Sequence, residues 1–152
     1  MTFAAELVTM LAAGVFAGGA LFASVAEHPA RTEAGPTVAL AQFSPSYRRA
    51  APLQGGSALL ALVGGIVAAF ASGNWVWALA GGCVGAVVPL TLVVIAPVNR
   101  QLMSEPGHLA DSQTRELLSS WARLHALRTA LGLAGFIISV RSLRPTDAGR
   151  IE

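Results

Sequence analysis

The sequence predicts an all-α protein that crosses a membrane as a four-helix bundle. More than half of its 152 residues are hydrophobic (54%) and only 12% are charged, whereas a soluble domain carries about twice that share of charge. Four apolar stretches each approach the roughly 20 residues that a transmembrane helix needs. We expect these spans at about residues 3–27, 53–71, 75–98 and 118–141. They leave no room for a separate soluble domain, so residues 1–152 are expected to form a single membrane domain.

The first stretch is expected to span the membrane rather than to be removed as a signal peptide. No Arg or Lys precedes Arg31, whereas signal peptides begin with a basic region. The segment from Pro29 to Pro52 is expected to be a long loop between the first two spans. Loops of this length are usually functional, and this one contains Phe43 and Tyr47. We therefore expect it to fold back over the mouth of the bundle.

The later spans contain residues that should shape the helices and their packing. Small residues recur at four-residue spacing, as in Gly14 and Gly18, and in Gly81 and Gly85. This pattern favours close helix packing in a four-helix bundle and nothing finer. A homo-oligomer is left open. Pro89 is expected to kink the third span and free a carbonyl group. Trp75 and Trp77 are predicted interfacial anchors, and Asp111 is expected to cap the last helix.

Arginines gather at one end of the predicted bundle. Arg31, Arg48 and Arg49 lie in the first connection and Arg100 and Arg115 lie in the last, whereas the turn between the middle spans is uncharged. The expected location is the inner membrane of a bacterium. By the positive-inside rule, both longer connections are expected on its cytoplasmic side and both termini on its outer side. The formal net charge is only +2. The lipid bilayer is thus the expected partner of the arginines, and a nucleic acid is not.

Nearly all the suggestive polar residues are expected at that same end, which predicts one pocket there. Trp121, His125 and Arg128 fall within about 60° of arc on one helical face, and a histidine and an arginine inside a membrane usually mark a site. Glu27 is the expected ion-pair partner of Arg128, while Arg123 points away. Four further candidates meet at the same end: His28, Arg31, Tyr47 and Asn99. His108 is expected to be solvated and inert.

Three kinds of protein remain open from these residues. His28 and His125 with Glu27 would make a two-histidine, one-carboxylate set that suits copper or iron, although no HxxxH, HxH or CxxC spacing is present. A site without metal is preferred for that reason. The metal-dependent protein and the protein with a metal-free site are two of the three. The third hypothesis is a non-catalytic four-span protein for binding or assembly, in which the polar groups only hold the helices together.

Four motifs in order carry a family resemblance. The first span ends in Glu27-His-Pro-Ala-Arg31, and Phe43-x-Pro-x-Tyr47-Arg, Pro97-x-Asn99-x-x-Leu and Trp121-x-x-Leu-His125-x-x-Arg128 follow. This set resembles the anthrone oxygenase family, which is also catalogued as a domain of unknown function. The resemblance implies a membrane monooxygenase that oxidises an anthrone to an anthraquinone with O₂ and without metal, flavin or haem. It also implies functional roles for Trp121 and His125.

The expected chemistry is histidine-assisted and free of cofactors. The hydrogen on the anthrone carbon opposite the keto group is acidic. A neutral His125 beside the charge of Arg128 could remove it. Arg128, Arg31 or Asn99 could stabilise the resulting oxyanion, and Trp121 and Tyr47 offer flat surfaces to an apolar aromatic small molecule. The expected catalytic residues are His125, His28, Arg128 and Trp121. The expected substrate contacts are Tyr47, Asn99, Arg31 and Glu27.

Overall fold

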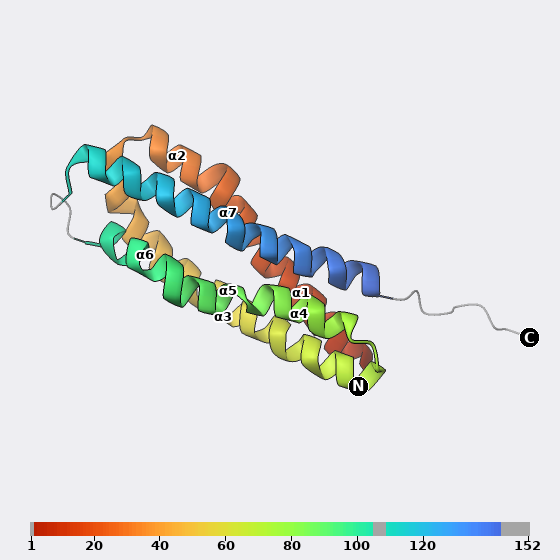
Figure 1. The fold of residues 1–152 in the computed structure, drawn as a ribbon. Coiled ribbons are helices and arrows are strands. Elements are labelled where there is room, and N and C mark those ends of the chain that lie inside the picture. Colours follow the sequence, from red (N-terminus) through yellow and green to blue (C-terminus); the bar gives the residue numbers. More distant parts are fainter. Residues whose placement is uncertain (1, 105–108, 144–152) are drawn as a thin grey trace, which may run out of the picture.

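The computed structural model describes residues 2–104 and 109–143, so His108 lies outside the described part of the chain. Four helical rods run alternately up and down the molecule (Figure 1). The first rod is α1 (Thr2–Phe22), the π-helix η1 (Ala23–Glu27) and α2 (His28–Glu33); the second is α3 (Pro36–Ser72); the third is α4 (Val76–Gly85), α5 (Val87–Pro89), the π-helix η2 (Leu90–Ile95) and α6 (Ala96–Leu102); the fourth is α7 (Asp111–Ser142). Because α1 and α4 each contact both α3 and α7, the rods close into a four-helix bundle.

All four rods are long and apolar enough to cross a membrane, as the sequence predicts. They contain 32, 37, 27 and 32 residues, which at the rise of an α-helix is roughly 40–55 Å. The protein is therefore a multi-pass membrane protein. The rods exceed the roughly 30 Å of a hydrocarbon core. The end of the bundle formed by α2, the N-terminal part of α3, α6 and the start of α7 (Figure 1) carries Arg48, Arg49, Arg100 and Arg115. We expect the excess length to lie at this charged end.

The prediction of a long loop between the first two spans is wrong. The chain turns within Ala34 and Gly35, where Gly35 has a φ of 91° that favours glycine. Helix α3 then begins at Pro36, a residue that is well suited to the first turn of a helix. It continues through Pro45 and Pro52, which membrane helices tolerate when neighbouring groups satisfy the freed carbonyls. The segment thus reaches the mouth of the bundle as a helix.

Both π-helices lie next to prolines. Helix η1 ends directly before His28-Pro29, and η2 lies between Pro89 and Pro97. A proline lacks the N–H that would continue the regular hydrogen-bond ladder, so a wider turn forms beside it. The regular α-helix ends at Pro89 and gives way to η2, whereas the kink and the freed carbonyl expected there stay predictions.

Glycines set the helix separations in the half of the bundle away from the arginines. A Cβ atom on Gly65 would lie 2.5 Å from the carbonyl oxygen of Trp77, and one on Gly135 would lie 2.6 Å from that of Ala80. Trp77 is buried against small residues of α3, so its prediction as an interfacial anchor is wrong, whereas Trp75 is exposed.

The cap of the last helix also differs from the prediction. Ala110 precedes the helix, and its backbone N–H donates to the side chain of Gln113 over 3.1 Å. Asp111 is instead the first helical residue, where its negative charge still suits the N-terminus of the helix.

Candidate functional site

A cavity of about 590 Å³ lies between the four rods, towards the end that carries the arginines. This volume falls within the range of small-molecule sites. All the predicted site residues except His28 contribute to its wall: Glu27, Arg31, Tyr47, Asn99, Trp121, His125 and Arg128. The tertiary structure therefore brings together residues from four separate parts of the sequence.

Most of the cavity wall is apolar, and the cavity is open at the side of the bundle. Both π-helices contribute, through residues such as Ala23 and Ile95. Phe22, Leu53 and Leu92 lie on the wall with 62%, 60% and 69% of their surface exposed. These exposed apolar side chains form part of the outer surface of the bundle beside the cavity.

His125 is held in one orientation by contacts at both ring nitrogens. Its Nε2 lies 3.2 Å from the carbonyl oxygen of Ala20, and its Nδ1 lies 3.5 Å from Nη1 of Arg128. A carbonyl oxygen can only accept a hydrogen bond and a guanidinium can only donate one. The arrangement therefore requires a hydrogen on Nε2 and a lone pair on Nδ1, which is the neutral imidazole.

Arg128 lies in the cavity wall without a carboxylate partner among residues 2–104 and 109–143. Its Nη2 donates to the Gln54 side-chain oxygen over 3.2 Å, its guanidinium lies 4.8 Å from the centre of the Phe16 ring, and its Nε has no partner among the described residues. The predicted ion pair between Glu27 and Arg128 is wrong. Glu27 instead pairs with Arg31, one helical turn away on the same rod, at 2.8 Å.

Gln54 reaches Arg128 because α1 has no side chain at the point of contact. A Cβ atom on Gly19 would overlap the amide nitrogen of Gln54. Sequence reasoning missed Gln54. An amide inside a stretch that is predicted to lie in hydrocarbon was nevertheless a usable signal, because such a group needs a polar partner.

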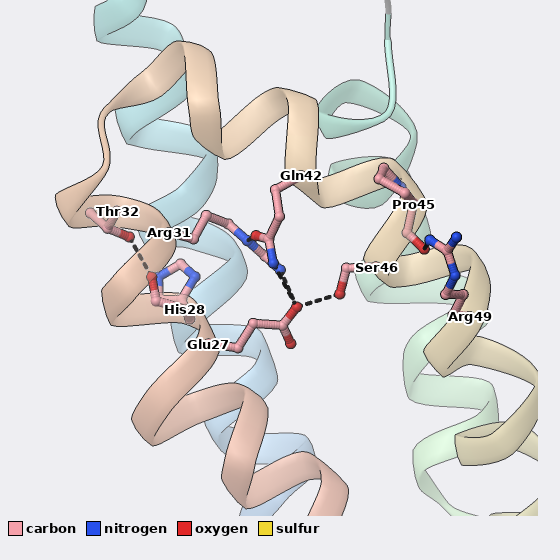
Figure 2. Close-up of polar contacts among 8 residues, drawn as sticks. All are labelled: Glu27, His28, Arg31, Thr32, Gln42, Pro45, Ser46 and Arg49. Carbon is pink, nitrogen blue, oxygen red and sulfur yellow. Dashed lines mark hydrogen bonds and ion pairs between the residues drawn. The ribbon is translucent and has the colours of Figure 1, made fainter.

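The carboxylate of Glu27 accepts three hydrogen bonds on one oxygen, as Figure 2 shows. The donors are the side chains of Arg31, Gln42 and Ser46. Arg31 also donates from Nε to Gln42 over 2.6 Å. Gln42 and Ser46 were missed because residues 29–52 were expected to form a loop. Both residues lie instead on helix α3, where their side chains bond to Glu27 of the first rod. This cluster joins the first rod to α3 at the edge of the cavity.

Trp121 connects the histidines to the opposite wall. Its ring is stacked with those of His125, at 4.3 Å between centroids, and His28, at 5.1 Å. Its Nε1 donates to Oδ1 of Asn99 over 3.0 Å. Phe43 meets the indole edge-on and stacks with Tyr47. His28 thus touches the site through Trp121 from outside the cavity wall.

No group of three His, Cys, Asp or Glu side chains within residues 2–104 and 109–143 is arranged to hold a metal ion. Cys83 is a free thiol in α4. Arg123 bonds to Ser119 and Ser120 on its own helix, away from the cavity, as the sequence predicts.

Comparison with known proteins decides the family. The sequence model for anthrone oxygenase matches residues 43–138, from near the start of α3 to near the end of α7. The chain belongs to the anthrone oxygenase family. The match includes Tyr47, Asn99, Trp121, His125 and Arg128, whereas the Glu27 cluster begins before it.

A curated member of this family is similar over part of its length. The anthrone oxygenase tpcL of Aspergillus fumigatus is 36% identical over 59 residues, which are 37% of this chain and 37% of that protein. The chain thus matches little more than a third of the length of the curated relative. No solved structure matches the chain.

Proposed function

We propose that this protein is a membrane monooxygenase that oxidises an anthrone-like aromatic ketone, or a related phenol, with O₂. The observation that carries the proposal is the neutral His125, whose Nδ1 lone pair lies in the wall of an apolar cavity. Beside it lies Arg128, which pairs with no carboxylate in the part of the chain that the structure describes. Its family membership agrees with an oxygenase.

His125 acts as the base in this proposal. The hydrogen on the carbon opposite the keto group of an anthrone is acidic, because its loss gives an aromatic anion. Arg128 moves from Nδ1 to the oxygen of the substrate, which leaves the lone pair of His125 free to accept that proton. The long contact of 3.5 Å between the two side chains suits such an exchange of partners.

Arg128 stabilises the negative charge that develops on the former keto oxygen. A guanidinium without a carboxylate neighbour keeps its charge available to the substrate, and Gln54 fixes its position through Nη2. The low polarity of the wall strengthens this interaction.

The substrate anion itself reduces O₂. It transfers an electron to O₂, and the two radicals combine at the deprotonated carbon to give a peroxide anion. This anion takes the proton back from His125, which gives the hydroperoxide and restores the neutral imidazole. Loss of water then leaves a second carbonyl group, so that the anthrone and O₂ become the anthraquinone and one water. No metal, flavin or haem takes part in this sequence of steps.

The side opening of the cavity suits this substrate class. An apolar tricyclic molecule and O₂ both concentrate in lipid, and Phe22, Leu53 and Leu92 line an apolar route from lipid. By the positive-inside rule, we place the arginine-rich end in the cytoplasm and the termini outside, in the inner membrane of a bacterium.

Oxygen uptake by the purified protein in detergent tests the proposal, with anthrone as substrate. His125→Ala should lower kcat by about 10²–10⁴-fold with unchanged thermal unfolding, whereas His28→Ala, outside the cavity wall, should retain most of the activity. Uptake that survives His125→Ala overturns the role of this residue. Near-stoichiometric copper or iron that both variants lose would replace the mechanism with a metal-dependent one.

A further inference from the structure

Asn99 has a side-chain amide whose orientation is fixed. The residue is 2% exposed, lies on α6 and contributes to the cavity wall. Trp121 donates its indole N–H to the Asn99 side chain over 3.0 Å. An indole nitrogen can only donate, so the acceptor in this bond must be the amide oxygen. The Nδ2 group of Asn99 is therefore the end that remains for another partner.

That Nδ2 group is buried and has no hydrogen-bond partner among the described residues. Buried donors are nearly always paired in folded proteins, because an unpaired one loses its bonds to water without replacement. A site that keeps such a donor beside a cavity can use it to bind an acceptor atom of a ligand.

We infer that Asn99 is a specificity-determining residue that donates a hydrogen bond from Nδ2 to an oxygen atom of the bound aromatic substrate. The inference rests on the proposed function and adds a second point of recognition to it. Trp121 is then a positioning residue, since it sets which end of the amide is offered.

The order of residues along α7 places the two recognition points on either side of His125. Trp121, which holds Asn99, lies four residues before His125, and Arg128 lies three residues after it, so the two are separated by roughly 10 Å of helix axis. A keto oxygen at Arg128 puts the reacting carbon near His125. The rest of the ring system then extends towards Asn99.

This geometry specifies the substrate class more closely. The matching molecule is a tricyclic ketone with a ring hydroxyl or a second oxygen on the side of the reacting carbon, rather than unsubstituted anthrone. Sites that hydrogen-bond a substrate hydroxyl discriminate strongly against analogues that lack it, because their own polar group is left unpaired.

The test compares oxygen uptake on anthrone with uptake on monohydroxylated anthrones that differ only in the position of the hydroxyl. The wild type should prefer at least one isomer over anthrone by 10-fold or more in kcat/KM. Asn99→Asp keeps an acceptor for Trp121 but offers no donor, so this preference should disappear, as it should in Asn99→Leu. Trp121→Phe should reduce the preference, and Gln101→Leu, an exposed position on the same helix, should leave it unchanged.

The ratio between two substrates separates recognition from a loss of structure, because a damaged fold lowers both rates alike. An Asn99→Asp variant that keeps the wild-type ratio overturns the inference. Binding of the corresponding anthraquinones can be measured without turnover. This measurement tests the role of Asn99 even if the wild type oxidises no anthrone. Tighter binding of the hydroxylated quinone by the wild type than by Asn99→Asp supports the inference in that case. Equal affinities, or no binding of either quinone, overturn it.

Discussion

Gly19→Ala tests whether the position of Arg128 depends on Gln54, without changing either residue. A Cβ atom at position 19 would overlap the amide nitrogen of Gln54, so this amide has to move. The bond from Arg128 to Gln54, now 3.2 Å, is then lost or lengthened. Gly18→Ala is the matched control, because a Cβ atom at position 18 meets nothing within 4 Å.

The expected magnitude follows from the bond that is lost. A hydrogen bond to a charged group contributes about 1.5–3 kcal/mol. The intrinsic helix preference of alanine over glycine is the same at both positions and cancels in the comparison. Gly19→Ala should thus be about 1.5–3 kcal/mol less stable than Gly18→Ala. If Arg128 needs this bond to meet the substrate oxygen, kcat/KM should also fall by roughly 10- to 150-fold.

Thermal unfolding and oxygen uptake in the same detergent measure the two effects. The reasoning is refuted if the alanine variants at positions 18 and 19 unfold together and share one kcat/KM, because Gln54 would then hold Arg128 only incidentally. Gln54→Leu should reproduce the loss of kcat/KM seen in Gly19→Ala. If it does not, the added methyl group acts by some route other than this bond.

Three further changes probe the fold and the opening of the cavity. Glu27→Gln leaves Arg31, whose side chain is 3% exposed, without its carboxylate, so unfolding should be easier by about 3–5 kcal/mol; an unchanged melting temperature contradicts this. Gly135→Ala should separate α4 from α7 and lower the melting temperature, whereas Gly82→Ala, with open space around it, should not. Leu53→Trp should narrow the opening and raise KM for an apolar substrate several-fold at constant kcat; an unchanged KM points to another route of access.

The class of the fold could be predicted because it depends on the hydrophobic composition and on the length of the apolar stretches. Four apolar stretches of the right length leave few alternatives to membrane-spanning helices. The segment from Pro29 to Pro52 was misjudged because prolines usually end helices in water. In this chain Pro36 starts a helix, and Pro45 and Pro52 lie inside it.

The meeting of the candidate site residues at one cavity could also be predicted, whereas the contacts among them could not. Antiparallel spans bring the end of the first and third rods to the start of the fourth, so Glu27, Asn99 and His125 were expected at one end, and all three line the cavity. The sequence could not show that Glu27 pairs with Arg31, or that Gln54 is the partner of Arg128.

The helical class of this protein, its location in a membrane and the gathering of its polar side chains at one end of the bundle all follow from the order of its residues. Three contacts follow only from how the helices pack: Arg128 meets no carboxylate of the described residues, His125 is held as a neutral ring, and Trp121 fixes the amide of Asn99. The reason is that hydrogen bonds require atoms within about 3.5 Å, whereas a shift of one residue moves a side chain by about 100° around the helix and 1.5 Å along it. Hydrophobic periodicity identifies the buried face, but the rotation and register of neighbouring helices, which choose the partner, come from their packing.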